Sequence, residues 1–214
     1  MFGPHVRGWN FDGSTLTPIA KISYFAYGTL KYGVNVATGR VDADAYAELL
    51  TGPGPGSIFG PQVRGWNFDA TAITAIAKIN FNAYGVAQYG VNVDGGDVEA
   101  DRIRRDRDGA GPGAGPSFPS DFRAFDFDGN VVNAAPGYQV TAFPTFYGGR
   151  VGLGDIDGTG NAELLAGAGR DPAADSTVAR YTYTGSALTA VAPSFAPFGT
   201  ATYGVNVAGG ALGY

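Results

Sequence analysis

Residues 154–169, GDIDGTGNAELLAGAG, form a glycine-rich loop that carries three carboxylates and leads into an apolar segment. Oxygen-bearing side chains recur at alternate positions: Asp155, Asp157, Thr159, Asn161 and Glu163. Calcium binds about six to eight oxygen ligands, and a short loop that wraps one ion must bend sharply, as it can at Gly160. The spacing therefore predicts a Ca²⁺ site in this loop, in preference to a solvated Asp-Gly turn.

A second loop of this kind precedes the same apolar motif earlier in the chain. Aligned on AELL, Arg40 stands where Asp155 stands in the loop above. Three carboxylates remain, and they predict a weaker calcium site whose ligands are Asp42, Asp44, the backbone carbonyl of Tyr46, and Glu48.

A third acidic loop has three carboxylates in place but departs from the pattern at its end. Asp97, Glu99 and Asp101 match the pattern, and a gapless alignment puts Arg105 where the closing Glu is expected. A guanidinium at that position would compete with the ion for the carboxylates. The third loop is the weakest of the three candidates.

These loops belong to an internal repeat of 56 to 58 residues. FGPHVRGWNFDGSTLTPIAKISYFAYGTLKYGVNV at 2–36 returns as FGPQVRGWNFDATAITAIAKINFNAYGVAQYGVNV at 59–93. Two weaker copies follow, marked by FDFD at 125–128, YTYT at 181–184, YGGRV at 147–151 and YGVNV at 203–207. We divide the chain into repeats at 2–58, 59–117, 118–173 and 174–214, which form one domain.

Within a repeat, apolar residues alternate with a period of two, which indicates strands. The first repeat predicts strands from Val6 to Phe11, Leu16 to Tyr27, Tyr32 to Val36 and Glu48 to Thr51. Asp12-Gly13 and Asp128-Gly129 are predicted to form hairpin turns. The segments GPGPG at 52–56 and GAGPGAGP at 109–116 are expected to end the strands that precede them.

Four short antiparallel strands per repeat predict a β-propeller with about four blades, either alone or as part of a larger or oligomeric ring. YGVNV and its counterparts at 32–36, 89–93, 147–151 and 203–207 are expected to be the innermost strands. The repeated aromatic residues after the start of each repeat are interpreted mainly as packing between blades, and a stacking platform for sugars or bases is the alternative.

FG at positions 2 and 59, the D-x-D-G-x-G-x-x-E loop before LLAGAG, and the repeat length together resemble the FG-GAP repeats of integrin-α-like β-propellers. The resemblance covers essentially the whole chain. It implies blades that hold calcium in the loop between their first two strands, in proteins that are mostly secreted or on cell surfaces. The family includes adhesion modules, lectins and domains attached to enzymes, so it indicates fold more closely than activity.

Composition excludes several other classes of protein. There is no cysteine, so disulfides and thiolate sites are excluded. Only 15% of residues are charged, the net charge is -5, and no basic face could follow a nucleic-acid backbone. No apolar run is long enough to insert into a membrane, and an export signal is absent from this sequence, so a signal for the expected extracellular location would have to lie elsewhere.

No catalytic constellation repeats, and we expect a non-enzymatic protein. His5 is the only histidine, and Gln62 replaces it in the next copy. The paired carboxylates all lie in the calcium-type loops, and GTGNAELLAG lacks the Lys-Ser/Thr ending of a phosphate loop. A structural or adhesive module with protein partners is the first interpretation, and a carbohydrate-binding propeller with glycan partners is the second.

The ends of the sequence are out of phase with the repeat. Residues 2–27 supply only the two outer strands of a blade, and 203–214 supply only an innermost strand. Exposed sheet edges recruit other chains. We therefore expect either a portion of a longer propeller or self-association of this chain.

Overall fold

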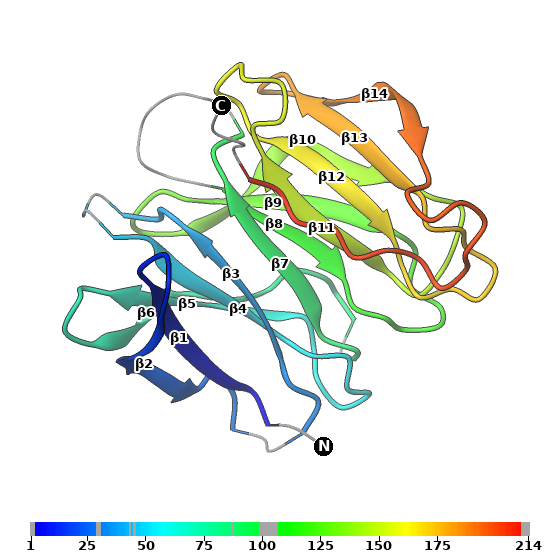
Figure 1. Cartoon of the computed structure of the whole chain (residues 1–214). Coiled ribbons are helices and arrows are strands. Elements are labelled where there is room, and N and C mark those ends of the chain that lie inside the picture. Colours follow the sequence, from blue (N-terminus) through cyan, green and yellow to red (C-terminus); the bar gives the residue numbers. More distant parts are fainter. Residues whose placement is uncertain are drawn as a thin grey trace.

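The computed structural model describes residues 3–28, 31–42, 44, 46–86, 88–98 and 107–210. Within these ranges the chain forms antiparallel strands arranged in four sheets, and no helix (Figure 1). The predicted all-β class is confirmed.

The strands pair in the order of the chain. Sheet 1 has two strands, β1 (His5–Phe11) and β2 (Leu16–Phe25). Sheet 2 has β3 (Val34–Gly39), β4 (Glu48–Pro53), β5 (Gln62–Phe68) and β6 (Ile73–Asn82). Sheet 3 has β7 (Val91–Gly96), β8 (Arg107–Pro112), β9 (Asp121–Phe127) and β10 (Val132–Thr141). Sheet 4 has β11 (Gly149–Gly154), β12 (Glu163–Ala168), β13 (Val178–Tyr183) and β14 (Leu188–Phe195).

Each four-stranded sheet takes two strands from one sequence repeat and two from the next. Its first two strands form a hairpin that carries the acidic loop, and its last two form a second hairpin in a conserved register. Trp9 pairs with Pro18 in sheet 1, as Trp66 pairs with Ala75 in sheet 2. Sheet 1 consists of the second hairpin alone.

The two strands of the second hairpin are joined by the same kind of turn in different sheets. In sheet 1 the amide of Asp12 donates to the carbonyl of Thr15, and the Asp12 carboxylate accepts from the amides of Ser14 and Thr15. Sheet 3 repeats the turn at Asp128, and Gly13 and Gly129 take φ values of 96° and 86°. The predicted Asp-Gly turns are confirmed, because the carboxylate satisfies the turn amides and glycine tolerates the positive φ.

The first strand of each four-stranded sheet begins two residues later than the sequence predicts. Tyr32 and Gly33 have φ values of 69° and 68°, and Tyr-Gly at 89–90, 147–148 and 203–204 is equally left-handed. Such residues cannot join an extended ladder, so β3 begins at Val34 rather than Tyr32. Two consecutive left-handed residues, one of them a tyrosine, gave no signal in the sequence pattern.

The glycine-proline segments do not end the strands where expected. β4 continues through Gly52 and Pro53, and β8 through residues 109–112. Gly52 faces the next sheet, where a Cβ would lie 2.4 Å from the carbonyl oxygen of Val91. Glycine therefore stays in the ladder because it lets two sheets approach closely.

Three apolar cores lie between successive sheets. Aromatic rings cross each boundary: Tyr24 contacts Trp66 between sheets 1 and 2, Phe81 contacts Phe125 between sheets 2 and 3, and Tyr138 contacts Tyr183 between sheets 3 and 4. The interpretation of the repeated aromatic positions as packing between units is confirmed at these contacts.

Polar contacts repeat at the first two boundaries. The hydroxyl of Tyr27 donates to the carbonyl of Gln62 in sheet 2, and the hydroxyl of Tyr84 donates to the carbonyl of Asp121 in sheet 3, both at 2.8 Å. The guanidinium of the next sheet lies over each ring: Arg64 over Tyr27 and Arg123 over Tyr84, both 4.9 Å from the ring centroid. The same pair of contacts, a tyrosine hydrogen bond and an arginine over the tyrosine ring, therefore joins sheet 1 to sheet 2 and sheet 2 to sheet 3.

First strands of neighbouring sheets also lie side by side. β7 contacts both β3 and β11, and the Asn35 and Asn92 side-chain amides each donate to a carbonyl of the next first strand. Residues 203–210 follow β11 in the same way: the amide of Val205 donates to the carbonyl of Ala168, and Gly209 packs on Leu153. They are not assigned as a strand, although the sequence predicts one at 203–207.

Candidate metal centres

Two acidic clusters lie in equivalent loops, each joining the first and second strands of a sheet. One loop, residues 155–162, lies between β11 and β12, and the other, residues 40–47, lies between β3 and β4. In each cluster three carboxylate oxygens, one from each residue, lie within 4.8 Å of one another. The clusters are Asp155, Asp157 and Glu163, and Asp42, Asp44 and Glu48.

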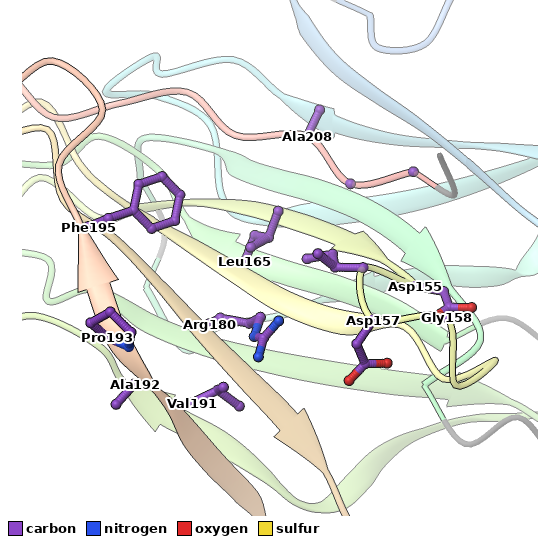
Figure 2. Close-up of a pocket in the computed structure, with 13 residues that line it drawn as sticks. Asp155, Asp157, Gly158, Leu165, Arg180, Val191, Ala192, Pro193, Phe195 and Ala208 are labelled. Atoms are coloured by element: carbon purple, nitrogen blue, oxygen red, sulfur yellow. The ribbon is translucent and has the colours of Figure 1, made fainter. Parts of the chain in front are cut away.

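The loop of sheet 4 is folded by its own polar groups. The amide of Gly160 donates to Oδ2 of Asp155 at 3.0 Å, and the amide of Thr159 donates to Oδ1 of Asp157 at 3.1 Å. Gly158 and Gly160 have φ values of 75° and 91°. These glycines let the chain reverse within a few residues, so that Asp155 and Asp157 reach the end of a groove on sheet 4 (Figure 2).

The cluster of sheet 4 is closed from inside the protein by Glu163. This side chain is buried at the start of β12, and its Oε2 accepts from the amide of Ile156 at 2.8 Å. Two further oxygens, Oδ1 of Asp155 and Oδ1 of Asn161, are buried without a hydrogen-bond partner. Hydrogen bonds to Thr159 lower the pKa of Asp157, which favours its charged form.

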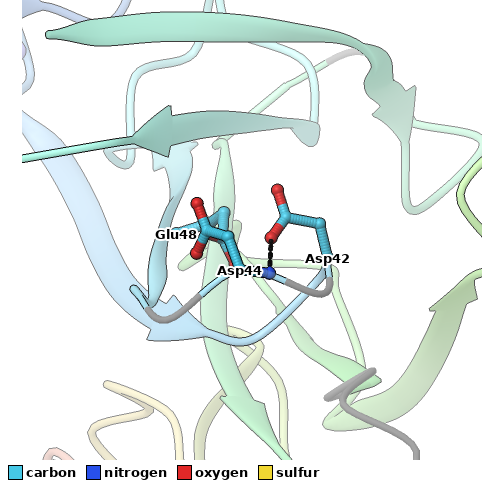
Figure 3. Close-up of side chains that lie close together, drawn as sticks. All are labelled: Asp42, Asp44 and Glu48. Atoms are coloured by element: carbon cyan, nitrogen blue, oxygen red, sulfur yellow. Dashed lines mark hydrogen bonds between the residues drawn. The ribbon is translucent and has the colours of Figure 1, made fainter.

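The loop of sheet 2 repeats this construction (Figure 3). The amide of Asp44 donates to Oδ1 of Asp42 at 3.0 Å, and the amide of Tyr46 donates to Oδ1 of Asp44 at 2.7 Å. Glu48 is 0% exposed, and its Oε2 accepts from the amide of Val41 at 2.9 Å. Its Oε1 is buried and has no partner.

The charge of Glu48 is costly in this position. Burial raises its pKa, and the negative charges of Asp42 and Asp44 raise it further, although the hydrogen bond from Val41 acts in the opposite direction. A buried carboxylate oxygen with no donor, next to two other carboxylates, is unfavourable unless a cation neutralises it.

The two loops share the buried closing glutamate but differ at other ligand positions. Arg40 replaces Asp155, and Asp44 replaces Thr159, so each loop keeps three carboxylates. Tyr46 takes the place of Asn161, and its exposed ring packs against Phe68. A side-chain ligand at that position is therefore available only in the loop of sheet 4, as the sequence predicts.

The loop of sheet 3 is only partly described. Asp97 is placed, and its carbonyl accepts from the amide of Ala162 in the loop of sheet 4. Glu99 and Asp101 lie outside the described residues. The ladder pairs Gly96 with Arg107, as Gly39 pairs with Glu48 in sheet 2.

Arg107, and not Arg105, therefore stands at the position of the closing Glu. The gapless alignment was wrong because this loop, residues 97–106, is two residues longer than its counterparts. The backbone register still places an arginine where the other loops have a glutamate.

The donors of both clusters suit a hard cation. The buried atoms of the two loops that lack a hydrogen-bond partner are all oxygens: Oε1 of Glu48, Oδ1 of Asp155 and Oδ1 of Asn161. Carboxylate and amide oxygens are acceptors, so each of them can bind a cation. The ligand types are carboxylate, amide carbonyl and hydroxyl oxygen, without nitrogen or sulfur. Such a set suits Ca²⁺ or Mg²⁺ and does not suit the softer transition metals.

Two contributions to the sites gave no signal in the sequence. The amides of Val41 and Ile156 hold the closing glutamates, and backbone donors carry no side-chain signature.

Asp94, which lies in β7, accepts from the amide of Leu153 at 2.7 Å and so links sheets 3 and 4. It resembles a ligand by residue type, but its position in a strand gives it this structural role.

No protein-family model, curated protein or solved structure matches the chain. Within the ranges that the structure covers, no helix is long and apolar enough to span a membrane.

Proposed function

We propose that this chain is a calcium-binding β-propeller module that acts outside the cell as a structural and adhesive scaffold for protein partners, and that it is not an enzyme. The observation that carries the proposal is the pair of equivalent acidic loops, each with a buried closing glutamate and at least one buried oxygen that lacks a donor. A cation in each loop would satisfy these oxygens and neutralise the carboxylates.

Calcium fits these loops better than magnesium. In the loop of sheet 4, five side chains and the backbone offer oxygens, and Ca²⁺ takes about six to eight such ligands in flexible geometry. Mg²⁺ prefers octahedral coordination with several waters and is rarely held by an all-protein cage. We propose Asp155, Asp157, Thr159, Asn161 and Glu163 as the stronger site, and Asp42, Asp44, the Tyr46 carbonyl and Glu48 as the weaker.

The propeller assignment is supported by the way the sheets stack. Sheet 1 packs on sheet 2, and sheet 2 packs on sheet 3, through the same aromatic and Tyr-Arg contacts, and the first strands of the four-stranded sheets run side by side (Figure 1). Radial repetition of four-stranded antiparallel sheets is the propeller plan. The FG-GAP-like motifs support the same proposal, with calcium loops between the first and second strands of a blade.

The extracellular location follows from the expected affinity. Extracellular calcium modules commonly have dissociation constants of about 10⁻⁴ to 10⁻³ M. Calcium at millimolar concentration would fill such loops, whereas a resting cytoplasm would leave them empty. A scaffold role fits a protein whose recurrent contacts serve the packing of sheets.

Calorimetric titration tests this proposal. Calcium should bind at two sites per chain, and magnesium should bind much more weakly. Glu163→Gln and Glu48→Gln should each remove one site, whereas Asp126→Asn, a control in β9 outside both clusters, should remove none. Absence of calcium binding at millimolar concentration, or binding that survives both substitutions, would overturn the proposal.

A further inference from the structure

Residues at equivalent positions of the sheets differ sharply in exposure. Val41 and Val98 lie two residues after β3 and β7, and each is 1% exposed because the next sheet covers it. Ile156 lies two residues after β11 and is held by its closing glutamate as Val41 is, but it is 44% exposed. One face of sheet 4 thus has the residues of a sheet-to-sheet boundary, but no sheet formed by the described residues covers it.

A second position on that face shows the same contrast. Tyr24, Phe81 and Phe195 occupy equivalent positions in sheets 1, 2 and 4, because each pairs with the equivalent residue of the neighbouring strand. Three positions after them come Tyr27, Tyr84 and Phe198, which are also aromatic. Tyr27 and Tyr84 are 6% and 8% exposed at their boundaries, whereas Phe198 is 68% exposed.

Sheet 1 also has an open face, on the side where the other sheets pack against the sheet that precedes them. The first strand of the second hairpin ends at an aromatic residue in every sheet: Phe11, Phe68, Phe127 and Tyr183. Phe127 is 5% exposed where it packs on sheet 2, but Phe11 is 62% exposed. Trp9 is about half exposed, whereas its counterpart Trp66 contacts Tyr24 of the preceding sheet.

The open face of sheet 4 is hollowed. A groove of about 1160 Å³ runs across it from Asp155 and Asp157 to Phe195, over Leu165, Arg180 and Val191 (Figure 2). Leu50, the counterpart of Leu165, is completely buried at the boundary with sheet 3. The groove therefore lies where side chains of a following sheet pack in the rest of the molecule.

We propose that the open face of sheet 4 binds the open face of sheet 1 of a second copy of this chain, head to tail. The two faces are the two halves of a boundary that the molecule already forms between its own sheets. The proposal rests on the propeller-type stacking proposed above, but not on calcium binding.

Two contacts of this interface follow from the internal ones. Tyr24 with Trp66, and Phe81 with Phe125, have ring centroids 4.6 and 4.7 Å apart, so Phe195 is the partner of Trp9 of the second copy. Arg7, which corresponds to Arg64, lies over Phe198 of the first copy, as Arg64 lies over Tyr27. Within its own chain Arg7 lies 5.0 Å from the Trp9 ring centroid, so its guanidinium is already next to this face.

The interface is heterologous, because different surfaces of the two copies meet. Such contacts propagate into a closed ring or an open fibre, depending on the rotation between copies. A ring stops at a fixed number of copies, whereas a fibre continues to grow as the concentration rises.

Light scattering coupled to size exclusion tests the proposal on the whole chain. The wild type should form species larger than a monomer, either a ring of fixed size or a fibre that grows with concentration. Phe198→Asp blocks one face and Trp9→Asp blocks the other, so each variant alone should associate about tenfold or more weakly. Their mixture should form a one-to-one dimer and nothing larger, because one competent pair of faces remains.

Controls separate this outcome from misfolding and from calcium effects. Both substituted side chains are exposed, and Val131→Asp, at an exposed turn outside the two faces, should leave association unchanged. Phe198→Tyr should strengthen it, since the hydroxyls of Tyr27 and Tyr84 bond across their boundaries. A wild type that stays monomeric in calcium and in chelator, or a variant mixture that forms no dimer, would overturn the inference even if calcium binds.

Discussion

Replacing Glu48 by Gln should stabilise the metal-free protein and weaken its response to calcium. Glu48 is fully buried, one of its oxygens lacks a donor, and Asp42 and Asp44 lie within 4.8 Å. Glutamine keeps the size of the side chain and the acceptor for the Val41 amide. It removes the charge that the two aspartates repel, so only the ligand function is lost.

The size of the effect follows from the geometry. Two unit charges 4.8 Å apart interact by about 0.9 kcal/mol in water and by about 3.5 kcal/mol at an effective dielectric constant of 20. Asp42 and Asp44 are only half buried, so the lower value applies to each pair. Without calcium, Glu48→Gln should therefore gain about 1 to 2 kcal/mol, which raises Tm by about 2 to 8 °C in a chain of this length.

Calcium should offset this gain. At about 10 mM calcium, a site with a dissociation constant of about 10⁻⁴ to 10⁻³ M stabilises the folded state by about 1.4 to 2.7 kcal/mol. The variant loses this contribution at one of the two sites, so the rise in its Tm on adding calcium should be smaller by that amount.

Thermal unfolding of both proteins in calcium and in chelator gives the four values needed, with Asp126→Asn as the control. If Glu48→Gln lowers Tm in chelator and leaves the calcium response unchanged, Glu48 is a structural acceptor and the ligand assignment is wrong.

Three further predictions follow from other contacts. Asn161→Ala should weaken calcium binding at the loop of sheet 4 in a titration and leave the other site unchanged, because Oδ1 of Asn161 has no other partner. Tyr84→Phe should cost about 1 to 2 kcal/mol in urea unfolding, because the bond to the Asp121 carbonyl is buried. Because the pKa of Glu48 is raised in the folded state, stability in chelator should fall as pH rises through that pKa, and Glu48→Gln should flatten this slope in pH-dependent melts.

Local signals predicted the hairpins and the two acidic clusters. Strands such as β1 and β4 begin within a residue of the predicted positions, because a period of two and Asp-Gly turns are set by neighbouring residues. Asp42 with Glu48, and Asp157 with Glu163, come together because they share short loops. The alternating oxygen ligands were therefore visible without tertiary structure.

Features that depend on neighbouring sheets were not predicted. Tyr32 is left-handed, and Gly52 remains in its strand because Val91 of the next sheet lies against it. The sequence alone aligns Arg105 with the closing glutamate, because the longer loop of sheet 3 shifts the alignment by two residues. The pairing of β7 with β8 shows that Arg107 has this position. The exposure of Ile156 and Phe11 depends on whether another sheet covers their positions, which the residue pattern of a single repeat does not encode.

Diffraction from crystals grown in calcium is the most direct test of the central claim that both acidic loops hold this ion. Anomalous difference maps at about 10 mM calcium should show one peak among Asp155, Asp157 and Glu163 and another among Asp42, Asp44 and Glu48. Ordered density for both loops with no peak at either cluster would contradict the account.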